Sequence, residues 1–219
     1  MNKLKTAKEA ISSIKPGSRV MIGGFGTAGY PNSLIDALCE SKIDNLTIIS
    51  NDLGSPGIGL GRLLRNNQVK ALIGTYYNWN PEVAEAKNQG KIEVTLVPQG
   101  TFAEAIRAAG VGIPAFYTPT SVGTDLSEGK EIRLINGKQY VLEYAIKADV
   151  ALIKAYIADE LGNLIYYKTA RNFNPIMAMA ADLVIVEVDE VVPAGSLNPE
   201  HIITPHIFVD IITKREAFQ

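Results

Sequence analysis

The sequence predicts an α/β fold: an open, mostly parallel sheet with helices on both faces and an inserted β-hairpin. Short aliphatic runs alternate with amphipathic segments, at the rhythm typical of parallel strands joined by right-handed helical crossovers. Asn136-Gly137 stands between two further short strands and is a strong hairpin signal. No repeat or linker divides the chain, so we expect a single domain over residues 1–219.

The helices of the first half begin at recognisable capping residues. Thr6 and Glu9 have the spacing of a capping box, and Asn80 precedes a proline at the first helical position. Expected helices cover residues 7–13, 60–65 and 102–109, with others starting at Pro31 and Asn80. Expected strands cover residues 20–22, 46–50, 69–75 and 93–97.

The second half opens with an irregular segment. Residues 110–129 are rich in glycine, proline, serine and threonine, and a loop of this length is expected to be functional or mobile. Hairpin strands are expected at 132–135 and 140–143, and further strands at 150–156, 164–167, 183–188 and, more weakly, 209–212. A turn is expected at 159–163 and a helix at 176–181.

Composition excludes several classes of protein. A net charge of -2 gives no field to hold nucleic acid or an anionic membrane. The single cysteine, Cys39, excludes an internal disulfide, fits a reducing compartment and is expected to be buried and inert. Residues 1–15 carry charges throughout, and no run reaches the roughly 18 apolar residues of a membrane span. We therefore expect a cytoplasmic protein.

A glycine-rich turn joins the first strand to the helix that follows it. It consists of Gly23, Gly24, Phe25, Gly26, Thr27, Ala28 and Gly29. Glycine lets a ligand approach the backbone, and the following helix start adds partial positive charge, so the turn predicts binding of an anionic or phosphate-bearing ligand. The alternative is a turn that only packs a strand against a helix. Binding is favoured because four glycines exceed what such a turn needs.

A dinucleotide site is the first specific hypothesis. Gly24 to Gly29 match G-x-G-x-x-G, and Asp52 lies where a ribose-binding acid would lie. However, Tyr30-Pro31 interrupts the helix that this motif normally begins, because proline disfavours helix in the preceding residue. NAD binding is therefore disfavoured.

No catalytic motif for a nucleophile or a metal is present in the sequence. His201 and His206 flank a proline with no cysteine nearby, so no metal site is expected. Glu187, Asp189 and Glu190 are expected to lie in a solvated loop and not to form an acid–base pair.

Other candidates carry two interpretations each. Arg171, beside Asn172, could bind a carboxylate or take part in a cap or ion pair. Tyr76, Tyr77 and Trp79 could line a pocket, but packing against a partner is the favoured interpretation.

Residues 16–31 resemble the first signature of the family I CoA-transferases. The matching residues are Gly17, the three apolar residues 20–22, Gly23-Gly24-Phe25, Gly29 and Pro31, whereas Pro16 replaces the usual Asp or Asn. Further similar stretches are 49–52, 97–101, 118–120, 123–124, 148–153, 162–163 and 170–175. The resemblance covers nearly the whole chain and is to the α subunits of acetate, butyrate–acetoacetate and 3-oxoacid CoA-transferases.

The resemblance implies a division of labour between two subunits. In this family a glutamate in a Ser-Glu-Asn-Gly motif of the β subunit is the nucleophile, and no such motif occurs here. The resemblance thus implies no catalytic residue in this chain, no metal, no permanently bound cofactor, and coenzyme A as a substrate held at the turn of residues 23–29. It also implies a β-subunit partner, an α2β2 assembly, and acetate, butyrate or acetoacetate as the carboxylate.

Overall fold

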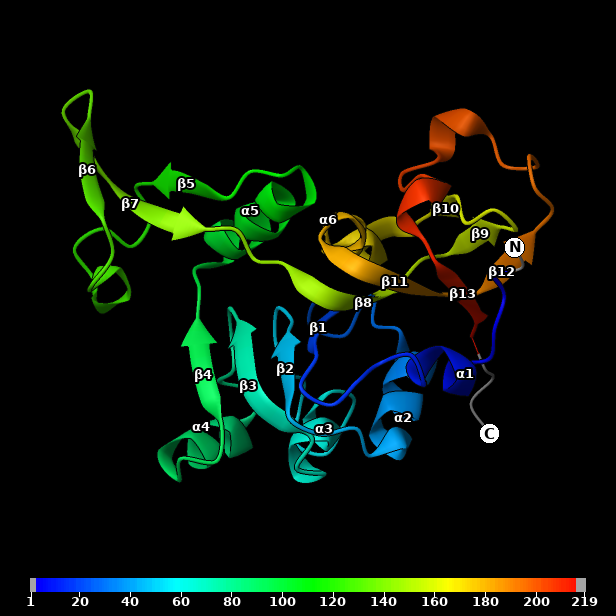
Figure 1. The fold of residues 1–219 in the computed structure, drawn as a ribbon, viewed down its shortest axis with the longest axis horizontal. Coiled ribbons are helices and arrows are strands. Elements are labelled where there is room, and N and C mark those ends of the chain that lie inside the picture. Colours follow the sequence, from blue (N-terminus) through cyan, green and yellow to red (C-terminus); the bar gives the residue numbers. More distant parts are fainter. Residues whose placement is uncertain (1–2, 216–219) are drawn as a thin grey trace.

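The computed structural model describes residues 3–215 and is built on a parallel sheet of seven strands. The strand order is β13-β11-β8-β1-β2-β3-β4, and every neighbouring pair is parallel (Figure 1). The strands are β1 (Arg19–Ile22), β2 (Leu46–Ile49), β3 (Val69–Gly74), β4 (Glu93–Leu96), β8 (Ala148–Lys154), β11 (Ala181–Val188) and β13 (Ile211–Lys214). The predicted parallel α/β architecture is confirmed.

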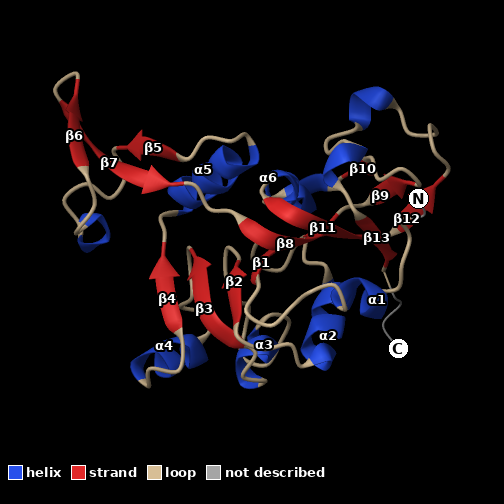
Figure 2. Ribbon diagram, viewed as in Figure 1, coloured by secondary structure: helices blue, strands red, loops and turns tan. Residues whose placement is uncertain are grey.

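Helices cover both faces of this sheet, as predicted (Figure 2). One face carries α1 (Ala7–Ile11), α2 (Asn32–Ser41), α3 (Gly61–Arg65) and α4 (Pro81–Asn88), and the other carries α5 (Gln99–Gly110) and α6 (Asn174–Met179). Side chains of a strand alternate between the two faces, so Val20 and Ile22 of β1 join one core while Met21 joins the other. In the described part of the chain, no helix is long and apolar enough to cross a membrane.

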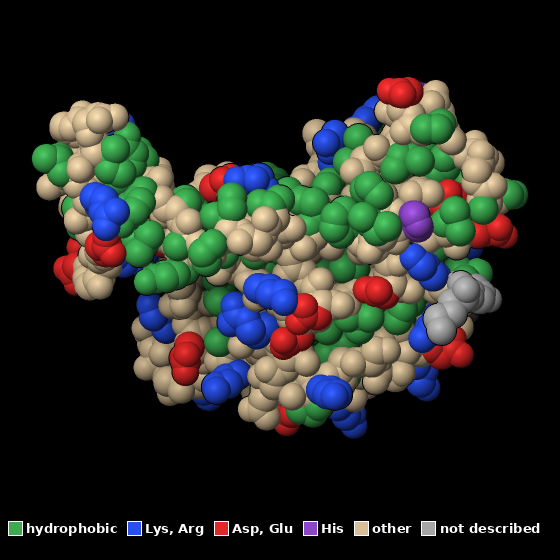
Figure 3. Space-filling view, turned by 45° about the horizontal axis from the view of Figure 1, so that its top comes forward, with side chains coloured by type: hydrophobic (Ala, Val, Ile, Leu, Met, Phe, Trp, Pro, Cys, Tyr) green, Lys and Arg blue, Asp and Glu red, His purple; other side chains and the backbone are tan. Residues whose placement is uncertain are grey.

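A three-stranded antiparallel sheet forms an arm beside the main body. It contains β5 (Ala115–Thr118), β7 (Lys138–Tyr144) and β6 (Ile132–Ile135), in that order. The predicted hairpin is confirmed, and Asn136 and Gly137 both have positive φ, as its two-residue turn requires. The expectation of an unbroken loop over 110–129 is wrong, because β5 finds its partner in β7 and lacks a local signal. The arm stands away from the body and exposes hydrophobic side chains (Figure 3).

A second small sheet lies beyond the carboxyl end of β8. It consists of β10 (Leu164–Ile165), β9 (Ile157–Asp159) and β12 (Glu190–Val192). The predicted strand 150–156 therefore ends early, at Lys154. The predicted turn at 159–163 is confirmed, and the Asp159 carboxylate holds it by accepting backbone hydrogen bonds from Leu161, Gly162 and Asn163.

Several predicted boundaries shift by two or three residues. The first helix ends at residue 11, α5 begins at Gln99 and α6 at Asn174, and the last strand starts at Ile211. Short 3-10 turns add η1 (Asp125–Ser127), η2 (Lys168–Arg171), η3 (Pro199–His201) and η4 (His206–Phe208). The last four residues of the tail, 216–219, lie outside the described residues.

Candidate functional site

A cavity opens where the carboxyl ends of β1, β2 and β3 meet. It has a volume of about 310 Å³, and we call it the edge cavity. Its lining consists of Phe25, Gly26, Asn51, Asp52, Thr75, Tyr76, Trp79 and Gln99. Ligands of open α/β sheets bind at this end of the strands. A larger depression of about 610 Å³ lies at the opposite, amino end, between α3 and α4, and is therefore a weaker candidate.

Two further cavities adjoin the glycine turn. One, of about 240 Å³, shares Gly26 and Trp79 with the edge cavity and extends along Thr27 towards Ile58. The other, of about 260 Å³, lies on the side of β8 and β11 and is lined by Thr27 and Gly29. The predicted turn thus forms a wall between separate hollows at the carboxyl edge of the sheet.

Packing within the protein explains most of the glycines in the turn. A Cβ on Gly23 would lie 1.8 Å from Asn174 Oδ1, and one on Gly24 would lie 2.4 Å from the ring of Tyr30. Gly29 is similarly crowded by the carbonyl of Ala170. Gly26 differs, because a Cβ there would meet only the Trp79 ring at 4.0 Å. Only at Gly26 does the bare backbone face open space.

The backbone donors of the turn are largely engaged inside the protein. The N–H of Gly24 donates to Asn172 Oδ1 at 3.2 Å, and that of Gly26 donates to Asp52 Oδ2 at 3.1 Å. Phe25 and Ala28 exchange backbone hydrogen bonds of 3.0 Å. The sequence argument for an anion cradle of free N–H groups is therefore corrected for these four residues.

The positive end of α2 is also occupied. Glu187 Oε2 accepts hydrogen bonds from the N–H of Ser33 at 2.7 Å and of Leu34 at 3.4 Å. A carboxylate of the protein itself thus fills the place where a bound anion was expected. What the turn offers a ligand is the surface of Gly26 and the exposed side chains of Phe25 and Thr27.

Asp52 fixes the turn to the end of β2. Its carboxylate accepts hydrogen bonds from the N–H of Gly26 and Gly54, the amide of Asn51 and the hydroxyl of Tyr30, the last at 2.7 Å. It is only 2% exposed, so it is not available to a ribose, which removes the main support for a dinucleotide site. Burial first, and the charge of Asp52 second, raise the pKa of the Tyr30 hydroxyl, which therefore remains a donor.

Sequence reasoning missed the polar floor of the edge cavity. Asn51 Oδ1 accepts from Gln99 Nε2 at 2.9 Å and from Thr75 Oγ1 at 2.8 Å. The three residues come from the ends of β2 and β3 and from the start of α5, and parallel strands bring them together. Their positions directly after strand ends are the signal that could have found them.

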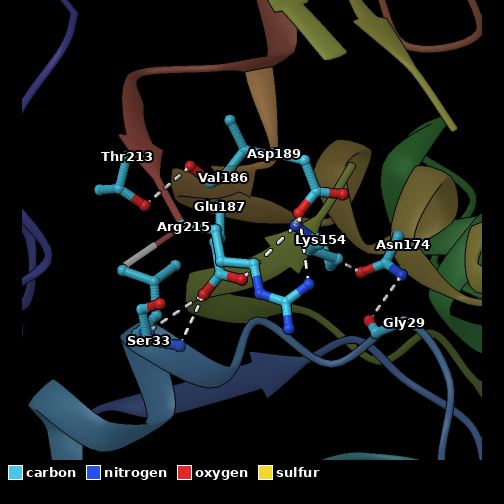
Figure 4. A network of polar contacts seen from close by, with 10 residues as sticks. Gly29, Ser33, Lys154, Asn174, Val186, Glu187, Asp189, Thr213 and Arg215 are labelled. Atoms are coloured by element: carbon cyan, nitrogen blue, oxygen red, sulfur yellow. Dashed lines mark hydrogen bonds and ion pairs between the residues drawn. The ribbon is translucent and has the colours of Figure 1, made fainter. Parts of the chain in front are cut away.

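Glu187 corrects the prediction of a solvated acidic loop. It is 0% exposed, and burial raises the pKa of its carboxyl, although Lys154 acts in the opposite direction. Lys154 Nζ lies 2.7 Å from Asp189 Oδ1 and 3.5 Å from Glu187 Oε1 (Figure 4). Glu190 is exposed and belongs to β12, so the three acids do not share one environment.

The remaining candidates have divergent surroundings. Tyr76 and Trp79 are exposed, touch edge to face with centroids 5.4 Å apart and line the edge cavity, whereas Tyr77 is buried. Arg171 is exposed at the end of η2, and Cys39 is buried as predicted. In residues 3–215, no group of His, Cys, Asp or Glu side chains could hold a metal ion.

Comparison with known sequences gives full-length matches. Residues 4–215 match the family model described as Coenzyme A transferase. The A-type subunit of a succinyl-CoA:3-ketoacid coenzyme A transferase from Helicobacter pylori is 49% identical, over 100% of this chain and 95% of that one. The A-type subunit of a 3-oxoadipate CoA-transferase from Acinetobacter baylyi is 52% identical, over 93% and 90%. The alpha subunit of the acetate CoA-transferase of Escherichia coli is 44% identical, over 98% of each.

Solved structures share the fold. An acyl-CoA transferase from Escherichia coli O157:H7, in a thioester complex with CoA, superposes with a TM-score of 0.89 at 22% identity. The match covers 98% of this chain and 50% of that one, so this chain spans about half the length of that transferase. Glutaconate coenzyme A-transferase from Acidaminococcus fermentans gives a TM-score of 0.82 at 21% identity, over 97% and 75%.

The family match and the curated relatives together define the class of protein. The chain belongs to the coenzyme A transferase family of enzymes and is a subunit of the α type. Its relatives are each named as one of two kinds of subunit, which implies a second, β-type partner.

Proposed function

We propose that this chain, together with a β subunit, moves CoA from an acyl-CoA to a short-chain carboxylate such as acetoacetate, acetate or butyrate. The names of the relatives support this substrate class, since they refer to succinyl-CoA with a 3-ketoacid, to acetate and to 3-oxoadipate. The carboxylate preference within that class belongs to the proposal.

The edge cavity carries the proposal that the nucleophile comes from the partner. Asp52 is the one carboxylate in its lining, and protein donors already engage both of its oxygens. The rest of the lining is amide, hydroxyl, aromatic or backbone, which can orient a thioester but cannot attack it as a carboxylate does. A reactive carboxylate must therefore be supplied from outside this chain.

The proposed chemistry needs neither water nor metal. The partner's glutamate attacks the thioester carbonyl, the C–S bond breaks, and CoA leaves as a thiolate from an acyl-glutamyl anhydride. The thiolate then attacks the glutamyl carbonyl, which releases the first carboxylate and leaves a glutamyl-CoA thioester. The second carboxylate reverses these steps and departs as the new acyl-CoA, so ping-pong kinetics are expected.

Exposed side chains around the cavity support docking of the partner at this edge. Phe25 and Trp79 are 48% and 55% exposed, and Tyr76 and Ile58 lie nearby with large exposed surfaces. Aromatic side chains of this kind are enriched at the cores of interfaces. We place CoA along Gly26 and Thr27, between this chain and the partner, in an α2β2 assembly.

Reconstitution tests the proposal. The purified chain alone should show no CoA transfer, and activity should appear when its cognate β subunit is added. Mass spectrometry of the complex treated with acyl-CoA should find the CoA adduct on a glutamate of the β subunit. Transfer by the isolated chain, or an adduct on one of its own side chains, would contradict the proposal.

A further inference from the structure

Helix α2 begins at a carboxylate that belongs to a distant strand. The first N–H groups of a helix have no acceptor within the helix, and the N-cap of α2 is Pro31, which offers no side-chain hydrogen bond. Glu187 of β11 accepts from Ser33 and Leu34 instead (Figure 4). It thereby does what a serine or aspartate N-cap does in other helices.

The buried charge of this cap is balanced from β8. A carboxylate is costly to bury without a counterion. Lys154, itself mostly buried, lies 3.5 Å from Glu187 Oε1 and forms a closer pair of 2.7 Å with Asp189. Arg215 extends the network, with its Nη1 3.6 Å from Asp189 Oδ1. Two acidic and two basic side chains therefore meet beside the start of α2.

The same strand also holds the other end of the segment. Asn174 Oδ1 accepts from the backbone N–H of Lys154 at 2.8 Å, and Asn174 Nδ2 donates to the carbonyl of Gly29 at 3.0 Å. The chain between Gly29 and Ser33 is thus tied at one end through Asn174 and at the other through Glu187. Both ties depend on β8 and its neighbour β11.

We propose that Glu187 is a positioning residue for CoA transfer, which acts by capping α2 and so fixing residues 27–33 at the cavity wall. The inference rests on the function proposed above. Thr27 and Tyr30 of this segment line the cavity shared with Gly26, so movement of the helix start moves the surface that faces the substrate. Small misplacements at such a surface are expensive in rate.

Reach matters for this role, whereas charge does not. Glu187 is fully buried, so a reacting atom cannot approach it as an acid or a base. A glutamine at this position keeps the length of the side chain and an oxygen that accepts the N–H of Ser33, but loses the charge. An aspartate keeps the charge but is one methylene too short to hold the 2.7 Å bond to Ser33.

The test compares Glu187→Gln and Glu187→Asp in the complex with the cognate β subunit. The Gln variant should keep kcat and KM for acyl-CoA within about twofold of the wild type. The Asp variant should lose about tenfold in kcat/KM, as expected for a weakened buried hydrogen bond of the positioning shell. Equal behaviour of the two variants, or the reverse order, would overturn the inference.

A matched control separates positioning from general stability. Thr213 is buried on β13 and donates a 3.1 Å bond to the carbonyl of Val186, beside Glu187 but away from α2. Thr213→Val should lower stability and leave kcat and KM unchanged. A loss of kcat/KM in this control as large as that in Glu187→Asp would overturn the inference.

Folding and function are kept apart in the readout. If Glu187→Asp does not fold, the Gln variant decides: unchanged constants with unchanged hydrogen-exchange protection of the Ser33 amide support the inference, and loss of either overturns it. If the wild-type complex shows no CoA transfer, the proposed function fails. Protection of that amide in Glu187→Asp, measured without substrate, then still decides whether Glu187 fixes α2, because full protection would overturn it.

Discussion

The hydroxyl of Tyr30 donates a 2.7 Å hydrogen bond to Asp52 Oδ1 and thereby ties the start of α2 to the end of β2. The same aromatic ring lies where a side chain on Gly24 would have to lie. One residue thus accounts for a glycine, fixes a buried carboxylate and lines one of the cavities at the turn.

Tyr30→Phe removes one donor from a buried carboxylate. Because Asp52 keeps its other three donors, we expect the free energy of unfolding to fall by about 1–3 kcal/mol. Urea denaturation measures it. Tyr117→Phe is the control, since Tyr117 donates to Glu131 at the exposed arm and should change stability by less than about 0.5 kcal/mol. Equal losses in the two variants would contradict the assignment.

Gly24→Ala and Gly26→Ala should fail in different ways. At Gly24 the φ of +128° and the Tyr30 ring leave no room for a Cβ, so we expect a loss of stability of about 2 kcal/mol or more. At Gly26 the φ of +60° costs about 1 kcal/mol, and the new methyl group points into open space.

The kinetic readout of this pair tests where the ligand lies. In the reconstituted enzyme, Gly26→Ala should raise KM for acyl-CoA more than its small loss of stability explains. If Gly26→Ala leaves KM at the wild-type value, CoA does not approach the turn at this residue.

Glu187 should give stability an unusual dependence on pH. Burial raises its pKa above the ordinary value of 4.5, so the folded protein keeps a proton that the unfolded chain has released. Stability from this group therefore falls as pH rises from 4.5 through the folded pKa. Lys154, Asp189 and Arg215 face the same network and are common to both proteins compared below.

The comparison is the wild type against Glu187→Gln, which does not titrate. The unfolding free energy of the wild type minus that of the variant should decrease over this pH range and then level off. Urea denaturation at a series of pH values measures it. A difference that grows with pH would mean that the pair with Lys154 outweighs the cost of burial.

Trp79→Ala should weaken assembly with the β subunit. The indole is 55% exposed in this chain, so its removal should change the stability of the isolated subunit little. Loss of a buried aromatic at an interface typically costs about 2 kcal/mol or more, which is roughly a thirtyfold rise in Kd. Titration calorimetry with the β subunit measures it. Ile207→Ala, at a site that is 72% exposed on η4, is the control and should leave Kd unchanged.

Periodicity and capping predicted the main sheet and the two layers of helices, because these depend on local sequence. The strand β5 escaped prediction because its pairing with β7 joins Ala115 to Tyr144, far along the chain. Glu187 escaped for a related reason. A charged residue near a strand end suggests solvent, and only the fold shows that α2 and Lys154 supply its partners.

The candidate site was predictable in place but not in physical role. The turn at residues 23–29 does lie at the carboxyl edge of the sheet, beside cavities. Its glycines, however, are shaped by side chains that follow roughly 150 residues later, such as Asn172 and Asn174. Spacing within a motif cannot reveal which groups from elsewhere already occupy its donors.

The central place of β1 has a consequence for biosynthesis. Its far edge is completed by β8, and the backbone N–H of Arg19 donates to Asp149, 130 residues further on. A ribosome must therefore deliver most of the polypeptide before this edge is closed, and an open strand edge invites aggregation. The hollow beside β1 is consequently the last region to mature, and nascent fragments that stop short of β8 should depend on chaperones.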